Sequence, residues 1–259
     1  NAQGEHLFAD TDWQDEIYRA AVSHEHNVSL TGGISKKSWS MPYRVSVGYT
    51  GQEGILKGSD YKRVTAGFNI NPSLFDKHLN INVNGKYSYS KTNPGGQDAV
   101  GAAVSMDPTR PVKSSDEKFK NWGGYWQWAL PTTSYDPTFP YNRNDDAPTN
   151  PVEKVENYDF YKSAHILLGN VEADYKIHGF EDLHLHANIA GEYSTGGEYN
   201  TNNPQSTYGF YYGGNSENKE KKYNVVATAY AQYTKDFNKA NHFDIMAGYE
   251  WQHFWRSKN

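Results

Sequence analysis

Aromatic residues gather in two polar stretches of the chain, where exposed rings could bind a ligand. The first stretch has a background of Pro, Asp and Asn, and the second lies in the next long polar segment. Flat rings stack on the apolar faces of sugars, while neighbouring Asn and Asp side chains hydrogen-bond the hydroxyl groups. Eight rings are therefore candidate substrate contacts: Trp122, Tyr125, Trp126 and Trp128 in the first stretch, and Tyr208, Phe210, Tyr211 and Tyr212 in the second. Two alternatives stay open, namely contact with a partner protein and packing of the loops upon themselves.

Histidines recur in pairs two residues apart, a spacing that places both rings on one face of a strand. Such imidazole pairs can bind a divalent metal, but solvated histidines on a polar strand face fit the same spacing. We therefore predict no metal site, and the role of His184 and His186 stays open. Carboxylates and serines abound, yet none stands in a motif for hydrolysis or acyl transfer. We expect no enzymatic activity and no cofactor.

The composition narrows the class of protein. Of the 259 residues 15% are aromatic, with 21 Tyr against 3 Met, which favours β-structure over a helical bundle. No apolar run approaches the roughly 18 to 20 residues that a membrane-spanning helix requires. A net charge of −5 provides no basic face for nucleic acid, and zero cysteines exclude disulfides. The chain has neither an initiator Met nor a signal peptide, so we expect a processed chain or a piece of a longer one.

Alternation of apolar and polar residues is the strongest structural signal. It recurs over segments of about 9 to 12 residues, the length of a tilted strand that crosses hydrocarbon. Clear segments span residues 43–50, 64–70, 79–89, 183–193, 223–233 and 243–251, with less regular ones near 22–31 and 163–177. About eight antiparallel strands joined in sequence is the simplest interpretation. In two of them the apolar positions are candidate lipid-facing residues: Tyr43, Val45, Val47 and Tyr49, and Val225, Ala227, Ala229 and Tyr233.

The links between these strands differ in length. Long loops are predicted at about 91–161 and 195–222, and short links at 32–40, 71–78, 178–182 and 235–241. Alternate links of antiparallel neighbours lie at the same end of a sheet, so the short links share one end. Only the short link 51–59 falls at the long-loop end. Before the first strand, Thr11–Val22 predicts one or two helical turns, capped by Thr11 or Asp12, with Trp13, Ile17 and Ala20 on one face.

Alternation fits both a membrane barrel and a soluble β-sandwich, because each has one apolar face. Strand length, aromatic residues near the strand ends and the lopsided loops favour the barrel, whose short turns are periplasmic and whose long loops are extracellular. The predicted fold class is thus all-β, an antiparallel up-and-down transmembrane barrel segment. Eight strands alone would enclose a filled interior, so a fragment of a larger barrel is the preferred interpretation. A soluble sandwich acting as a carbohydrate-binding module is the alternative.

Several motifs, in a fixed order, give this chain a family resemblance. They are TDWQDEIYR at 11–19, HNVSLTGG at 26–33, YRVSVGYTGQEGILKGSDYKRVTAGFNI at 43–70 and GAAVSMDP at 101–108. Together they resemble the barrel of SusC/RagA-like TonB-dependent outer-membrane transporters. The resemblance extends more weakly over nearly the whole chain.

The resemblance implies a domain division and a set of partners. Residues 1–21 would lead from an internal plug into a partial barrel at 22–259, in the outer membrane of a Gram-negative, Bacteroidetes-like cell. It also implies import of oligosaccharides or other large nutrients, with a SusD-like surface lipoprotein as a lid. A link to TonB is implied through the missing parts of the full-length protein to which this chain would belong, which we call the parent. The plug and the TonB-contacting segment are not visible in this sequence.

Overall fold

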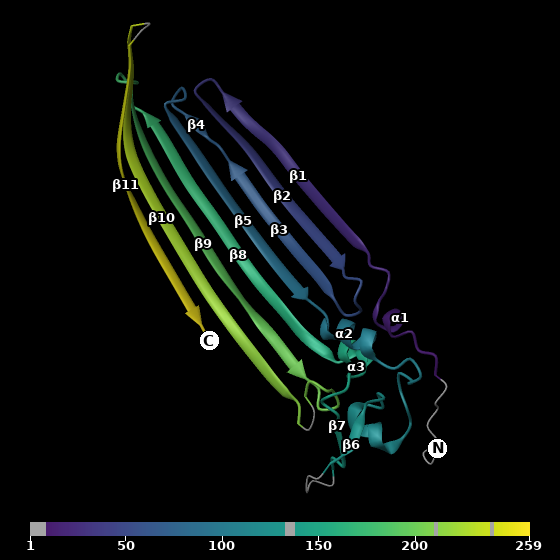
Figure 1. Ribbon diagram of the computed structural model, residues 1–259. Coiled ribbons are helices and arrows are strands. Elements are labelled where there is room, and N and C mark those ends of the chain that lie inside the picture. Colours follow the sequence, from purple (N-terminus) through teal and green to yellow (C-terminus); the bar gives the residue numbers. More distant parts are fainter. Residues whose placement is uncertain (1–8, 133–137, 210–211, 239–240) are drawn as a thin grey trace.

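One large antiparallel sheet dominates the computed structural model, which describes residues 9–132, 138–209, 212–238 and 241–259 (Figure 1). Its nine strands follow the order β1-β2-β3-β5-β8-β9-β10-β11, with the short β4 pairing beside β2 and β5. The strands are β1 (Ser23–Lys36), β2 (Trp39–Glu53), β3 (Asp60–Ile70), β4 (Ser73–Leu74), β5 (Leu79–Asn93), β8 (Tyr158–Lys176), β9 (Leu183–Asn202), β10 (Gly214–Asn238) and β11 (Asn241–Lys258). The prediction of about eight sequential antiparallel strands is confirmed.

The register places the alternating apolar residues side by side across the sheet. Val47 pairs with Val28 on one side and with Ala66 on the other. Farther along, Ala227 lies between Ile189 and Trp251. Because side chains alternate between faces with a period of two, this register collects most of the apolar residues on one face and most of the polar residues on the other.

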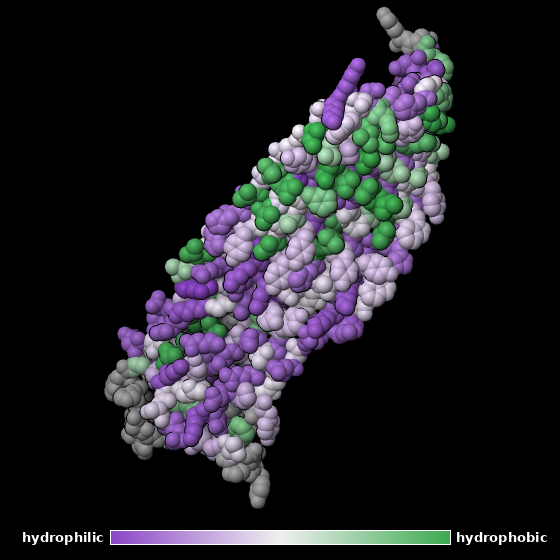
Figure 2. All heavy atoms as spheres, turned by 180° about the vertical axis from the view of Figure 1, so that it is seen from behind, coloured by the Kyte–Doolittle hydropathy of each residue, from purple (hydrophilic) through white to green (hydrophobic). Residues whose placement is uncertain are grey.

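The apolar face of the sheet is not covered by a second layer in the described part of the chain. Val45 is 45% exposed and Val47 is 54% exposed. The second sheet contains only the two short strands β6 (Ala129–Pro131) and β7 (Tyr141–Arg143). In Figure 2 the hydrophobic side chains gather over the half of the sheet nearest the short turns, and polar ones replace them toward the loops. A single layer with a bare apolar band is a barrel wall, so the β-sandwich alternative is wrong.

The strands run farther than the alternation alone predicts. The predicted loop at 195–222 is wrong in its bounds, because β9 continues to Asn202 and β10 begins at Gly214. Similarly, the predicted link at 32–40 shrinks to two residues, Lys37 and Ser38, between β1 and β2. Near both ends the backbone ladder continues through polar residues, which need no apolar face once a strand has left hydrocarbon.

The helices gather with the long loops at one end of the sheet (Figure 1). They are α1 (Trp13–Ile17), α2 (Asp98–Ser105), the 3-10 helix η1 (Glu117–Trp122) and α3 (Pro151–Glu156). No helix in the described ranges combines the length and apolarity needed to cross a membrane. We call α1, the link 51–59, residues 94–157 and residues 203–213 the loop unit.

Helix α1 confirms part of the sequence-based expectation. Asp12 caps it by accepting hydrogen bonds from the backbone N–H groups of Gln14 and Asp15 at 3.0 and 3.2 Å. Trp13 and Ile17 are buried as predicted, but Ala20 is exposed and lies outside the helix. The helix ends earlier because Tyr18 is extended and forms a bridge with Leu56. The predicted division of the chain into a lead-in at 1–21 and a partial barrel at 22–259 stays a prediction. Helix α1 packs within the loop unit.

Candidate functional site

The loop unit is built around a hydrophobic core of its own. The core residues come from α1, from the link 51–59 and from the segment 94–157: Trp13, Ile17, Leu56, Ala99, Ala103, Met106, Phe119, Trp122, Tyr125, Trp126, Val152 and Val155. Segments distant in sequence thus fold together as they would in a small water-soluble domain. The long loops present a shaped surface at the end of the sheet.

Asn150 organises the polar interior of this unit. Its side-chain oxygen accepts hydrogen bonds from the backbone N–H groups of Val152 and Glu153, at 3.0 and 3.2 Å, and so caps α3. Its Nδ2 donates to the carbonyls of Val112 and Trp126, at 2.8 and 3.1 Å. One amide therefore joins the start of α3 to two loop segments that lack regular structure.

Glu153 connects the two long loops to each other. It is fully buried, and its carboxylate accepts hydrogen bonds from the backbone N–H and the hydroxyl of Thr207, at 2.8 and 2.7 Å. Burial raises the pKa of Glu153 above its usual value, outweighing the hydrogen bonds from Thr207 and Asn157 that lower it. The link is strong only while both hydrogen bonds are made in this dry site.

A second link between the same loops lies nearer the surface. Lys154 Nζ contacts Asp98 Oδ2 at 2.6 Å, and the Tyr208 hydroxyl donates to Asp98 Oδ1 at 3.0 Å. Burial raises the pKa of Asp98, but the hydrogen bonds and charge of these partners more than offset it and hold the pKa below its usual value. Burial and the Asp98 charge raise the pKa of the Tyr208 hydroxyl, so it stays a donor at neutral pH.

The structure divides the eight predicted ligand-contact rings. Trp122, Tyr125 and Trp126 are buried in the loop core, which favours the loop-packing alternative for these three. Trp128 is partly buried against that core, with the Arg110 guanidinium 5.1 Å from its ring centre. The other rings lie in the second loop: Tyr208 takes part in the Asp98 link, Tyr212 is 80% exposed, and Phe210 and Tyr211 lie outside the described residues.

The predicted lipid-facing residues are all on the apolar face, where neighbouring strands place them together. Val45 and Val47 are exposed, as is Ala229, while the other five are half-buried by their neighbours: Tyr43, Tyr49, Val225, Ala227 and Tyr233. Contact with lipid stays a prediction. The arrangement is the one that a lipid-exposed strand face requires.

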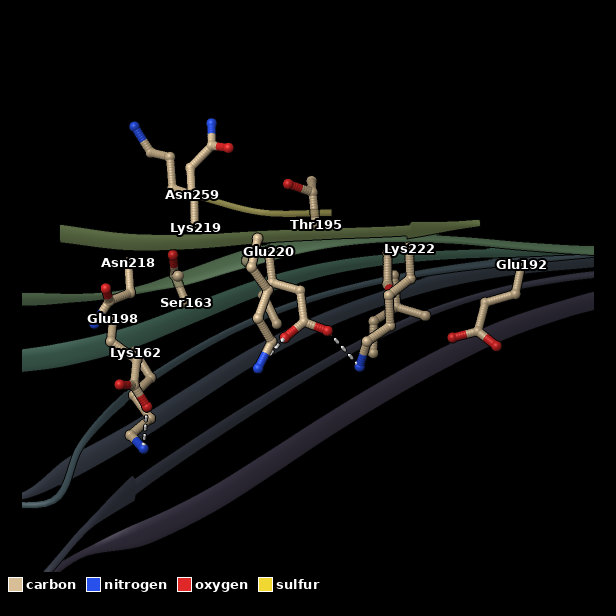
Figure 3. Close-up of a pocket in the computed structure, with 16 residues that line it drawn as sticks. Lys162, Ser163, Glu192, Thr195, Glu198, Asn218, Lys219, Glu220, Lys222 and Asn259 are labelled. Carbon is tan, nitrogen blue, oxygen red and sulfur yellow. Dashed lines mark ion pairs between the residues drawn. The ribbon is translucent and has the colours of Figure 1, made fainter. Parts of the chain in front are cut away.

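The polar face carries a charged hollow of about 800 Å³ over β8 to β11 (Figure 3). Glu220 lies at its centre, 2.7 Å from Arg256 and 2.8 Å from Lys222. Lys162 and Glu198 form a further ion pair at 2.5 Å. In Figure 3 the side chains of Glu220 and Lys222 point to the same side of the sheet. Such a polar, charged surface suits the interior of a wide barrel better than a packed core.

The two histidines from the sequence analysis lie on this polar face toward the short turns. His184 Nδ1 lies 3.3 Å from Asp174, and His186 Nε2 lies 3.8 Å from Glu172. His186 also stacks on Tyr230, with ring centres 4.4 Å apart. Within the described residues, no group of three or more His, Asp or Glu side chains is arranged to hold a metal ion.

The two links between the long loops were not predicted from the sequence. Asn150 followed by Pro151 and, three residues on, by Glu153 is a recognisable helix start, with a cap residue, proline at the first position and an acid in the first turn. That signal predicts α3. It does not predict Thr207 as the partner of Glu153, because the two residues are 54 positions apart.

Comparison with known proteins agrees with this geometry. The chain is 43% identical to the TonB-dependent receptor SusC of Bacteroides thetaiotaomicron over 251 residues, which is 96% of this chain and 24% of SusC. It is 30% identical to the TonB-dependent receptor P26 of Formosa agariphila over 112 residues, 43% of this chain and 11% of that protein. The chain thus spans about a quarter of the curated relative that it matches over most of its length. No family model matches it.

Solved structures show the same fold. The RagAB peptide transporter superposes with a TM-score of 0.68 at 16% identity, covering 100% of this chain and 28% of the RagAB chain. The open-open state of the RagAB peptide importer also gives 0.68, covering 96% and 26%. The fold is therefore that of a wall segment of an outer-membrane transporter barrel. Within that class, the chain is a SusC/RagA-like TonB-dependent receptor segment, as its motifs predicted.

Proposed function

We propose that the protein containing this segment is a TonB-dependent importer in the outer membrane, and that the segment forms part of its barrel wall. The observation that carries the proposal is the bare apolar band on a single-layer sheet, with Val47 54% exposed. Lipid offers no hydrogen bonds, so strands that cross it must pair on both sides in a closed sheet. Each central strand from β2 to β10 here is paired on both sides.

The loop unit and the polar face have different roles in the proposed import. Loops folded around a core keep a fixed shape at the external end of the barrel, where a substrate arrives. The polar face lines the interior through which the substrate passes, and its charged hollow at Glu220 keeps that interior wet. TonB would act through the parts of the parent outside this chain.

Oligosaccharides or similar large nutrients are the proposed substrates, with a SusD-like surface lipoprotein as the partner at the loop end. The SusC/RagA-like motifs, such as GAAVSMDP at 101–108, support this assignment. The RagAB structures are described as peptide transporters, so peptides are the competing substrate class. Among the predicted rings, Tyr212 has the exposure that contact with either substrate needs.

A growth and uptake experiment tests the proposal. Cells lacking the parent gene are complemented with the wild-type gene, in backgrounds with and without TonB, and are given labelled oligosaccharides, peptides or a monosaccharide. We expect complementation to restore uptake of oligosaccharides in the TonB-competent background alone, with monosaccharide uptake unchanged throughout. If uptake of peptides were restored instead, the substrate class would be peptides rather than oligosaccharides. Uptake that is independent of TonB would contradict the proposal of a TonB-dependent importer.

A further inference from the structure

Four lysines form a belt on the apolar face of the sheet, toward the loop end. Lys62 on β3 pairs directly with Lys91 on β5, and the same ladder row continues through Ser163 and Gly197 to Lys219 on β10. The fourth member, Lys221, lies two residues from Lys219 and therefore on the same face. We call these four residues the lysine belt.

The belt directly follows the aromatic residues that end the apolar band. Lys91 stands two residues beyond Tyr89, and Lys221 stands two residues beyond Tyr223, in both strands on the side of the long loops. Two residues of a strand span about 7 Å. Tyr and Trp side chains mark the level of the headgroups in outer-membrane barrels. The lysine belt therefore lies at the outer edge of the headgroup layer, on the outward face.

The charges of the belt are only partly compensated within the chain. Lys62 has Asp60 at 3.6 Å and Lys219 has Glu217 at 2.7 Å. The ammonium of Lys91 lies over the Tyr161 ring, 4.0 Å from its centre, and Lys221 is exposed. Neither Lys91 nor Lys221 has a carboxylate within ion-pair distance among the described residues. Like charges directly opposite each other, as in Lys62 and Lys91, destabilise a sheet unless an anion lies between them.

The charged hollow on the polar face is different, because it brings its own counter-charges. Glu220 lies within 3.8 Å of Lys222, Arg256 and Lys258, and Glu198 neutralises Lys162. In the lysine belt, by contrast, Lys91 and Lys221 have no such counter-charge among the described residues. The lysine belt also lies on the same face of the sheet as the apolar band, which is the face of the proposed contact with lipid.

We propose that the lysine belt binds the phosphate groups of a phosphorylated glycolipid in the outer leaflet of the membrane. Lys91 and Lys221 supply the uncompensated charge, and the stacked pair Tyr161 and Tyr199, with ring centres 4.7 Å apart, lies beside Lys91 on the same face. This site would order a shell of anionic lipid around the barrel just below the loop unit. The inference rests on the proposed lipid contact of the apolar face and is independent of transport.

The test uses the purified full-length parent in a non-ionic detergent, with lipid A that carries its phosphate esters as the probe. Lipid A with the phosphates removed and inorganic phosphate are the comparison ligands. Binding is measured by native mass spectrometry and by the shift in Tm. The variant Lys91→Gln with Lys221→Gln removes the two uncompensated charges, and Lys36→Gln with Lys37→Gln makes the same charge change at the opposite end of the sheet. The pair Lys91→Arg with Lys221→Arg keeps both charges.

We expect phosphorylated lipid A to raise the Tm of the wild type, the arginine pair and the control pair. The glutamine pair should bind it about thirtyfold more weakly, since each of the two lysines contributes about 1 kcal/mol near an anionic surface. Equal binding by the wild type and the glutamine pair would overturn the proposal, as would equal stabilisation by dephosphorylated lipid A. An equal shift with inorganic phosphate would show a free-phosphate site and overturn the assignment to lipid.

Discussion

The sheet and the loop unit bury apolar side chains in opposite ways. In the described part of the chain, every buried hydrophobic residue belongs to the loop unit, from Trp13 to Val155. The sheet is much larger, yet its apolar side chains, such as Val47 and Ile189, are exposed on a bare face. The loop unit therefore buries its apolar side chains as a water-soluble domain does, whereas the bare face of the sheet is the one that the proposed contact with lipid requires.

This contrast shows that one chain can be stabilised by two different mechanisms. In the loop unit, apolar side chains leave water for a packed interior, which contributes about 25 cal/mol for each Å² removed from water. In the sheet, the backbone ladder satisfies the polar groups, and the proposed contact with lipid would supply the apolar contacts that a core otherwise provides. Substitutions in the two regions should consequently respond to different conditions.

The largest effect should come from Trp122→Ala, which empties the centre of the loop core. Trp122 is fully buried, and a Trp→Ala change in a core costs about 3 to 5 kcal/mol. We expect the loop unit to become open to pulse proteolysis within residues 94–157 while the barrel of the full-length parent stays intact. Tyr212→Ala is the control, because Tyr212 is 80% exposed and its loss should change stability by no more than about 0.5 kcal/mol. Unfolding of the barrel together with the loops would show that the two regions are one cooperative unit.

Val47→Arg tests whether the apolar face of the sheet contacts lipid, again through the free energy of unfolding. A charge on the lipid-facing side costs about 2 to 4 kcal/mol at the bilayer midplane. Urea unfolding of the parent in lipid vesicles measures this cost. Ser46→Arg is the matched control, because Ser46 is the next residue on the same strand and points to the polar face, where Gly67 directly opposite leaves room. Equal costs for the two variants would mean that the apolar face does not meet lipid.

The sheet was predictable from the sequence because each of its rules is local. Alternation with a period of two identifies a strand and its apolar face, as it does for Val45 and Val47, and neighbouring strands follow each other along the chain. The strand ends were less predictable. The pairing of Tyr161 with Tyr199 lies beyond the apolar band, where backbone hydrogen bonds continue without a hydrophobic signal.

The interior of the loop unit could not be predicted in this way. The aromatic residues near Trp122 were visible in the sequence, but a ring on a ligand surface and a ring in a core have the same residue type. Only packing against residues such as Ile17, more than 100 positions away, distinguishes them. Contacts of that separation leave no periodic trace in the sequence.

Glu153→Ala should have an intermediate effect that is confined to the loop unit. It leaves the Thr207 hydroxyl and N–H without their acceptor in a buried site, which costs about 1 to 3 kcal/mol. Glu153→Gln keeps an acceptor for the N–H and should cost less.

Because burial raises the pKa of Glu153, the wild-type folded form holds its proton better than the unfolded form does. Its contribution to stability is therefore greatest below the usual pKa of a glutamic acid and declines as the pH rises through the folded value. Hydrogen exchange in residues 94–157 at several pH values, corrected for intrinsic rates, measures this trend, which Glu153→Gln should remove.

Asp98→Asn should have the smallest effect and the opposite dependence on pH. Asp98 is held charged by Lys154 and by the Tyr208 hydroxyl, so its pKa is lowered in the folded protein. Stability from this link is present above the usual pKa of an aspartic acid and is lost as the pH falls through the folded value. The Asp98 side chain is 56% exposed, so solvent screens the pair and the variant should cost no more than about 1 kcal/mol at neutral pH.

The same hydrogen-exchange series at pH 7 and below distinguishes the two links. Acidification should weaken the Asp98 link while it strengthens the Glu153 link, and the double variant Asp98→Asn with Glu153→Gln should lose both responses. If Asp98→Asn alone abolished the whole pH dependence, the buried carboxylate would not be a separate link, and the two long loops would be held together at the surface of the loop unit rather than through its interior.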